Sequence, residues 1–270
     1  MAEHILGVTK VVNWLLAKPA LALLGALRIR PENPEYPIPN HIAMEFLVFL
    51  VAVVFFLWLK ARLSVENPGG TQQCMEALLS NSMGIGVKDL LDDMVGHGGD
   101  IYLPMLGTIG IFVLICNLIS VIPGLASPTA TASVPLGCAA LVFLYYNWAG
   151  VRKNGPLGHG KHFLGPVWWL AWLMLPIEIV SNLSRLLSLT VRLWVNMLVS
   201  ELLYSLFLGL TVALFIFTGR MNVLGYATGI LPLVAPPMFI LLHVFVAVLQ
   251  AFVFTILPVL YVSAVVAEAH

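Results

Sequence analysis

The sequence predicts an all-α membrane protein: a polytopic helical bundle with about five membrane helices, an interfacial amphipathic helix and a long, steeply tilted C-terminal helical hairpin. The chain is 60% hydrophobic and 10% charged, whereas ordinary soluble domains carry about 25% charged residues. Several apolar stretches reach the roughly 20 residues that a helix needs to cross a bilayer. The last two apolar stretches are much longer than one crossing.

The first elements are an amphipathic segment, a linker and a membrane span. Residues 28–40 (RIRPENPEYPIPN) hold four prolines, so no helix can persist there. The first clear span is residues 45–59, and Lys60 and Arg62 follow it. Cytoplasmic ends of membrane helices are enriched in basic residues. We therefore expect the N-terminus to lie outside and the C-terminus in the cytoplasm.

The middle of the chain predicts one interfacial helix and two spans. Residues 71–94 carry apolar side chains at roughly helical spacing with polar residues between them, which favours a helix on the membrane surface. Residues 101–123 and 131–150 are apolar and joined by a short turn. The basic stretch 151–162 is predicted to be a cytoplasmic loop.

The final third of the chain predicts two very long helices, over residues 166–217 and 229–267. At 1.5 Å per residue they would be about 78 and 58 Å long, roughly twice the hydrocarbon thickness. Unless each one breaks into two spans, they must lie steeply tilted as a hairpin. We expect one membrane domain, divided into residues 1–40 (amphipathic segment and linker), 41–165 (three spans and interfacial helix) and 166–270 (hairpin).

Ionisable side chains mark the first of these long helices. A charge inside a bilayer is costly and is normally functional. Glu178, Arg185 and Arg192 recur every seven residues and so share one helix face. Glu201 follows Arg192 by nine residues and points to the other side, about 35 Å along the helix from Glu178. Arg185 has a structural alternative, in which it extends toward the interface or pairs with Glu178.

The second long helix carries His243 and Gln250, which are seven residues apart and share a face. An imidazole changes its charge near neutral pH, and an amide both donates and accepts hydrogen bonds. A carboxylate such as Glu201 facing His243 predicts a proton relay; a satisfied interhelical hydrogen bond is the alternative. For Asn196 and Gln250 the alternative is packing between helices.

Arg192 cannot carry a proton, because a guanidinium group does not deprotonate in proteins. It can act as a fixed positive charge that favours the ionised form of an approaching carboxyl group and repels a proton moving straight through. This arrangement suits two half-paths separated by a charge barrier, with another group carrying the proton past it. The alternative is a structural arginine paired with a buried acid.

These residues carry a family resemblance. The run LSRLLSLTVRLWVNMLVSELL resembles the signature of subunit a of bacterial F-type ATP synthases, in which asparagine and glutamate follow an arginine by four and nine residues. Here those are Arg192, Asn196 and Glu201. The run LLHVFVAVLQAFVFTILPVLYVSAVVAEAH is similar to the second signature, with His243 and Gln250. Further matches over residues 40–270 are Glu178 and the motif residues Asn117, Pro123, Gly124, Pro128 and Thr129.

The resemblance implies a stator subunit of the ATP synthase membrane sector in a bacterial inner membrane. Protons would enter a periplasmic half-channel, protonate a carboxylate on a rotating c-subunit ring and leave through a cytoplasmic half-channel. Expected partners are the c-ring, the b-subunit peripheral stalk, indirectly the soluble ATPase head, and membrane lipid. On this reading no nucleic acid partner and no cofactor is expected.

The resemblance also implies roles for individual residues. Glu201, His243, Asn196 and Gln250 would lie on the periplasmic path, Glu178 near the cytoplasmic exit, and Glu45 at a possible channel mouth. Ser120 stands where some relatives carry an acid, which weakens the expectation of a relay group there. Trp194 and Val195 replace the commoner Phe-Gly before Asn196, so helix packing on the ring is expected to differ.

Other function classes fit less well. No hydrolase or phosphate-binding motif occurs in the sequence, so we expect a non-catalytic subunit and ATP chemistry on partner subunits. No metal site is expected, since His159 and His162 sit in a basic stretch that suits solvated side chains. An ion-coupled secondary transporter is the alternative, although such proteins usually show an internal repeat, and a purely structural scaffold would not need Arg192, Glu201 and His243 together.

Overall fold

The computed structural model is built from helices throughout the residues it describes. These are 7–26, 33, 36–64, 67–79, 86–96, 98–122, 125–164, 169, 171–218 and 230–267. The α-helices are α1 (Gly7–Ala26), α2 (Asn40–Ala61), α3 (Gly70–Leu79), α4 (Val87–Val95), α5 (Leu103–Leu118), α6 (Ser133–Leu164), α7 (Ala171–Thr218) and α9 (Ile230–Ala267). Short 3-10 turns lie at Gly99–Ile101 (η1), Ile119–Val121 (η2) and Pro128–Ala130 (η3).

Five helices are long and apolar enough to cross a membrane within the described residues. The candidate spans are Asn40–Ala61, Leu103–Val121, Ser133–Gly155, Trp172–Ala213 and Pro237–Val266. Helices suit this environment because each of their backbone polar groups is satisfied inside the segment. The predicted fold class, an all-α polytopic membrane protein, is therefore confirmed.

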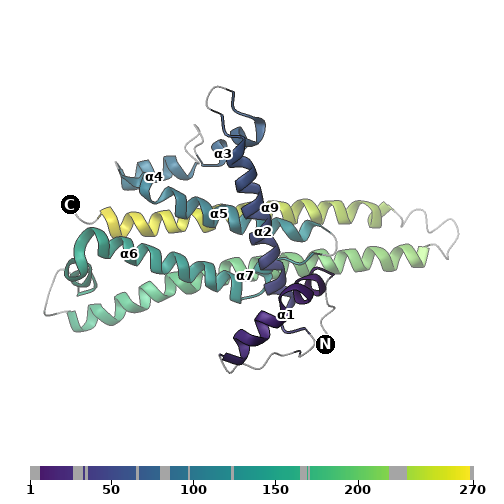
Figure 1. The fold of residues 1–270 in the computed structure, drawn as a ribbon, viewed down its shortest axis with the longest axis horizontal. Helices are drawn as coiled ribbons and strands as arrows, with labels where there is room; N and C mark the ends of the chain where they lie inside the picture. The colour runs from purple at the N-terminus through teal and green to yellow at the C-terminus, as the bar shows by residue number, and fades with distance from the viewer. Residues whose placement is uncertain are drawn as a thin grey trace. The chain divides into compact units, whose positions relative to one another are not determined.

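The chain forms two compact units, each built from three stretches. Unit 1 comprises Met1–Val53, Leu114–Thr131 and Val195–Leu249, and unit 2 comprises Val54–Val113, Ala132–Trp194 and Gln250–His270. In each unit a part of α7 lies beside a part of α9 (Figure 1). Each unit combines stretches from distant parts of the sequence. The predicted division of the membrane domain after residues 40 and 165 therefore stays a prediction.

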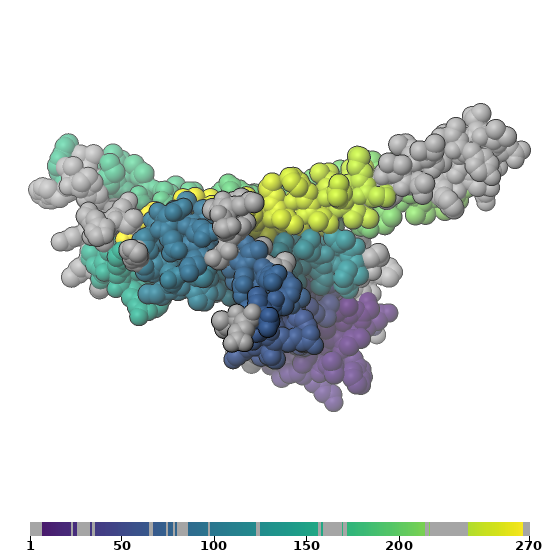
Figure 2. All heavy atoms as spheres, turned by 90° about the horizontal axis from the view of Figure 1, so that it is seen from above, coloured from purple at the N-terminus to yellow at the C-terminus, as the bar shows by residue number. Residues whose placement is uncertain are grey.

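In unit 1, α1 packs against the start of α2 through buried polar side chains. The Asn13 amide donates to Ile38 O, and Ile38 N–H donates back to Asn13 Oδ1, both at 2.9 Å. The Thr9 hydroxyl donates to Asn40 Oδ1 at 2.7 Å, and Val12 packs on Ile38. Figure 2 shows this contact, with α1 in purple against the blue start of α2. Asn13 thus satisfies backbone groups that the entry into α2 leaves free.

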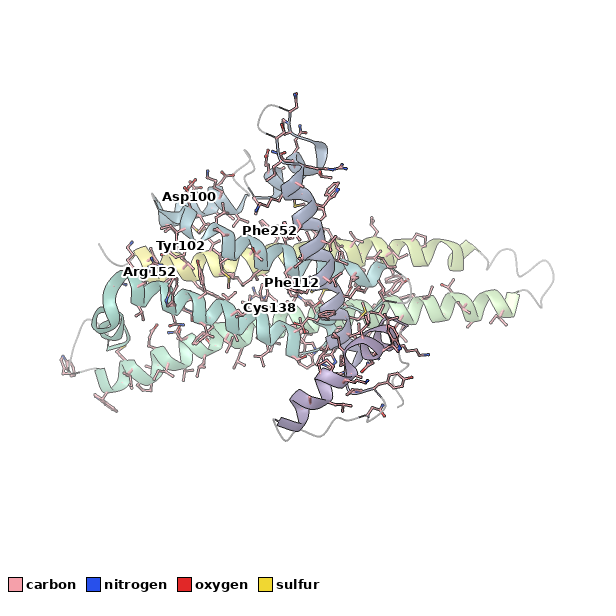
Figure 3. The ribbon with its side chains drawn as sticks, viewed as in Figure 1. Asp100, Tyr102, Phe112, Cys138, Arg152 and Phe252 are labelled. Atoms are coloured by element: carbon pink, nitrogen blue, oxygen red, sulfur yellow. The ribbon has the colours of Figure 1, made fainter. Side chains whose placement is uncertain are left out.

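In unit 2, the short helix α4 lies against α5 and α9. Val87 and Leu91 of α4 form a buried cluster with Leu106 of α5 and Val259 of α9. The opposite side of α4 bears Lys88 and several aspartates, which is the pattern of a helix at an interface. In Figure 3, Tyr102 just before α5 lies at the same end of the unit as Arg152 of α6, and the Tyr102 ring centroid is 6.2 Å from that of Tyr145.

Two polar side chains of α6 cap the C-terminal end of α9. The Lys153 ammonium donates to Val266 O at 2.8 Å, and the Asn154 amide donates to Val265 O at 3.1 Å. The last carbonyls of a helix have no partner within it, so these side chains complete α9. Gly155 then takes φ 71° and ψ 162° and breaks α6; a left-handed φ of this kind favours glycine.

Two local predictions are wrong. The single interfacial helix over residues 71–94 is two helices, α3 and α4, because Gly86 has extended backbone (φ −66°, ψ 149°) and a new helix begins at Val87. The predicted loop 151–162 is helical on both sides of Gly155. Its polar composition suggested a loop, but the contacts that Lys153 and Asn154 make with α9 keep the first part helical.

The two long C-terminal helices are confirmed. Helix α7 has 48 residues with Pro176 inside it, and α9 has 38. At 1.5 Å per residue they measure about 72 and 57 Å, against roughly 30 Å of hydrocarbon. Neither helix breaks into two spans, so the expectation of steep tilt follows from their length.

The close approach of α5 and α9 in unit 2 generates a first prediction. A Cβ added at Gly110 would overlap Thr255 Oγ1, which is itself held to Ala251 O at 2.8 Å. Gly110→Ala is expected to lower the free energy of unfolding by about 1–3 kcal/mol through overpacking. The matched control is Gly137→Ala on α6, where a Cβ meets nothing within 4 Å and helix propensity alone favours alanine. The measurement is the Tm of the purified complex in detergent; a Gly110→Ala value equal to that of the control would contradict the close approach.

Candidate functional site

The predicted site residues divide between the two units. Unit 1 holds Glu45, Asn196, Glu201 and His243, and unit 2 holds Glu178, Arg192 and Gln250. His243 and Gln250 on α9 are 4% and 2% exposed, whereas Arg192 and Asn196 on α7 are exposed and the three glutamates are half-buried.

In unit 1, His243 is bonded at both nitrogens. The Ser120 hydroxyl lies 2.9 Å from Nε2, and the Ser200 hydroxyl lies 2.6 Å from Nδ1. Ser120 belongs to η2 and Ser200 to α7, so the ring is held between two other elements. The Tyr204 ring, one turn after Ser200, has its centroid 6.4 Å from that of the imidazole.

Asn117 connects the end of α5 to this histidine. Its amide donates to Ala247 O of α9 at 3.3 Å, and its Oδ1 accepts a hydrogen bond from the Thr129 hydroxyl at 2.7 Å. Its backbone carbonyl accepts from the Ser120 hydroxyl at 3.2 Å. Asn117 and Thr129 are completely buried, and each of these bonds therefore offsets the high cost of dehydrating a polar group.

Ser127 extends the network to the carboxylate. Its backbone N–H donates to Glu201 Oε1 at 3.4 Å. Its hydroxyl lies 2.6 Å from the Thr129 hydroxyl and donates to Cys116 O at 2.9 Å. We call the following residues the His243 cluster: Asn117, Ser120, Ser127, Thr129, Ser200, Glu201 and His243.

The His243 cluster brings an imidazole and a carboxylate into one hydrogen-bonded network. Glu201 does not bond His243 directly, contrary to the simplest form of the predicted relay; serine, threonine and asparagine groups link them. Hydroxyl groups both donate and accept hydrogen bonds, and imidazole carries a proton on either nitrogen. Such a network can accept, hold and reorient protons within an apolar environment.

In unit 2, a second polar group surrounds Arg185. Its guanidinium carbon lies 5.5 Å from the centroid of the Tyr261 ring, a cation–π contact. The Tyr146 ring lies 5.8 Å from that of Tyr261, and its hydroxyl donates to Asn182 Oδ1 at 2.7 Å. Within the described part of the chain, Lys88–Asp100, at 4.0 Å, is the ion pair that forms, and Arg185 forms none with Glu178. Arg185 therefore contacts an aromatic ring rather than the carboxylate.

Arg192 lies on the exposed side of α7, while Leu189 and Leu193 beside it are buried. The described residues give it no acidic partner, contrary to the alternative of a structural arginine paired with a buried acid. The same helix exposes a row of apolar side chains, each at least 38% exposed: Val180, Leu183, Leu187 and Val191 in unit 2, and Val195, Val199, Leu202 and Leu206 in unit 1.

Several residues of the network were not predicted from the sequence. Ser200 precedes Glu201 but has no signal of its own, and Ser127 lies in a connecting segment. Ser120 stands where some relatives carry an acid, which weakens the expectation of a relay group there, yet its hydroxyl contacts His243. The motif residues Pro123 and Gly124, and the side chains of His159 and His162, lie outside what the structure describes.

The fold and these groups define a polytopic membrane protein with a buried, hydrogen-bonded polar network between helices. The family model described as ATP synthase A chain matches residues 42–263. The chain is 38% identical over 267 residues to ATP synthase subunit a of Koribacter versatilis, covering 99% of each chain. It is 40% identical over 258 residues to ATP synthase subunit a of Solibacter usitatus, covering 96% of this chain and 99% of the relative. The chain belongs to the ATP synthase A chain family.

The His243 cluster generates a second prediction. Thr129→Val keeps the shape of a buried side chain but leaves Asn117 Oδ1 and the Ser127 hydroxyl without their shared partner. The expected loss in the free energy of unfolding is about 1–3 kcal/mol, read as a lower Tm of the complex. Thr211→Val is the control, because the Thr211 hydroxyl donates within α7 to Phe207 O. Equal Tm values for the two variants would show that the network adds no stability.

Proposed function

We propose that this chain conducts protons through the membrane sector of an ATP synthase and carries no catalytic site of its own. The observation that carries the proposal is the His243 cluster, a connected set of hydrogen-bonding residues between apolar helices of a family member. Burying such groups in an apolar unit is costly unless they are hydrogen-bonded, and ionisable groups within membrane segments are normally functional. Proton transfer uses both their donor and their acceptor capacity.

The first half-path would run through unit 1. Glu201 takes up a proton from the periplasmic side, His243 and the hydroxyl groups around it pass it on, and Asn196 lies further along α7. Glu201 is half-buried, so part of its side chain stays accessible from outside the chain. Glu45, near the start of α2, is the candidate mouth.

Arg192 would separate the two half-paths. A carboxyl group on a c-subunit that approaches this fixed positive charge is driven to its ionised form and releases its proton. Glu178, on the same side of α7 two heptads earlier, is the candidate exit group. The exposure of Arg192 supports this role, because a barrier charge has to face the partner rather than the interior of its own chain.

The exposed apolar row on α7 supports the c-ring as the partner on that side. The described residues leave this row exposed, and such a surface suits another apolar helix. The b-subunit stalk and the soluble ATPase head complete the proposed assembly. ATP chemistry takes place on partner subunits, in the soluble ATPase head.

Two aromatic–arginine pairs support the proposed orientation, with the N-terminus outside and the C-terminus cytoplasmic. Arg62 lies over Trp58 near the end of α2, with its guanidinium carbon 4.6 Å from the ring centroid, and Arg152 lies over Trp148 of α6 at 5.2 Å. Tryptophan and arginine together are typical of the interface, and basic residues favour its cytoplasmic side. Both pairs stand at span ends that we assign to the cytoplasm of a bacterial cell. The secondary transporter is not favoured by family membership.

Arg192→Ala tests the barrier. Without the fixed charge, a ring carboxyl group keeps its proton, and ATP-driven acidification of membrane vesicles is expected to fall to background. Arg185→Ala is the matched control on the same helix: its guanidinium group rests on Tyr261, and pumping should stay near the wild-type rate. Subunit assembly is measured in parallel. Pumping by assembled Arg192→Ala at near wild-type rate would make Arg192 structural and the mechanism wrong.

A further inference from the structure

Both nitrogens of the buried His243 ring are occupied by hydroxyl groups, and the two hydroxyls are not equivalent. Ser120 Oγ, near Nε2, also lies 3.2 Å from the backbone oxygen of Asn117. That oxygen can only accept a hydrogen bond. Ser200 Oγ lies 2.6 Å from Nδ1, the shorter of the two contacts to the ring.

Counting hydrogens assigns the ring its resting tautomer. Ser120 has one hydroxyl hydrogen, and donating it to Asn117 O leaves its oxygen free to accept from Nε2–H. Nδ1 of a neutral imidazole with a protonated Nε2 is then an acceptor, and it accepts from the Ser200 hydroxyl. In the opposite tautomer the Ser120 hydrogen must turn to Nε2, and Asn117 O loses this bond.

We propose that Ser200 and Ser120 are positioning residues that hold His243 as the Nε2–H tautomer, with Nδ1 directed to Ser200 as the proton-accepting nitrogen. This inference rests on the proposed function, in which His243 accepts a proton. It adds that Nδ1, on the α7 side, is where the proton arrives. Ser200 precedes Glu201 in α7, so the carboxylate and the accepting nitrogen are approached from the same helix.

The polar groups that the structure places at the ring are the two serine hydroxyls and the backbone carbonyl of Asn117. The Tyr204 ring lies to one side of the imidazole, tilted by 35° to it, with 6.4 Å between the ring centroids. Glu201 is the charged neighbour in the His243 cluster, and it is bonded to Ser127 N–H. Removing the Ser200 hydroxyl therefore removes the donor to Nδ1, while the Ser120 contacts at Nε2 and Asn117 O remain.

The test compares Ser200→Ala with Ser205→Ala in the assembled membrane sector. The Ser205 hydroxyl is exposed and donates to Leu202 O within α7. Passive proton conduction is measured in vesicles stripped of the soluble ATPase head, and the tautomer is read from the 15N shifts of the His243 ring, assigned by difference with His243→Gln. Ser200→Ala is expected to lower conduction by about tenfold or more, because a misplaced reacting group is costly, and to shift the Nδ1 signal, because that nitrogen loses its hydrogen-bond donor. Ser205→Ala should change neither quantity, and Ser200→Thr should restore both.

The outcomes separate this inference from the proposed function. If Ser200→Ala conducts like wild type while His243→Ala does not conduct, the inference fails and the proposed function stands. If His243→Ala conducts at the wild-type rate, the histidine has no role in proton transfer and both fail. Lower conduction by Ser200→Ala with unchanged nitrogen signals also overturns the positioning role. Should Ser200→Ala not assemble, Ser120→Ala decides through the same two readouts at Nε2.

Discussion

The structure depends on one constraint: a polar group between membrane helices has to find its hydrogen-bond partner within the protein. An unpaired amide or hydroxyl group in an apolar environment costs about 2–7 kcal/mol. The buried Asn117 meets this constraint with three bonds, to Ala247, Thr129 and Ser120. These bonds tie the end of α5 to α9 and to the segment before α6. The same groups that hold unit 1 together therefore also form the proposed proton path.

The constraint explains why the functional groups are distributed as they are. Unit 1 holds Glu201 and His243, which can change protonation state, within a network of neutral donors and acceptors. Unit 2 holds Arg192, whose charge is permanent, on the exposed side of α7. A group that transfers protons needs partners on both sides, whereas a fixed charge that acts on another chain needs an open face. Helices α7 and α9 contribute to both units and thus to both proposed roles.

Buried polar groups also explain where α6 is interrupted. It remains helical through Lys153 and Asn154 because these side chains satisfy the last carbonyls of α9. The break comes at Gly155, after those contacts are made. Local composition predicted a loop over residues 151–162. Lys153 and Asn154 remain helical instead, because they donate hydrogen bonds to the last carbonyls of α9. In an apolar environment, the need for backbone partners outweighs local propensity.

The sequence alone determined the membrane class, the five spans, the two long C-terminal helices and the identity of the ionisable residues in them. The spans can be read from the hydropathy and length of each segment. Ionisable side chains such as Arg192, Glu201 and His243 are rare in such apolar helices and therefore stand out in the sequence. Tertiary structure decided which groups meet. Ser120 and His243 are 123 positions apart, and nothing local marks Ser200 as a partner of His243 or Ser127 as a partner of Glu201. A hydroxyl group becomes part of a proton path only through the groups within about 3 Å of it, and those are set by packing between distant helices.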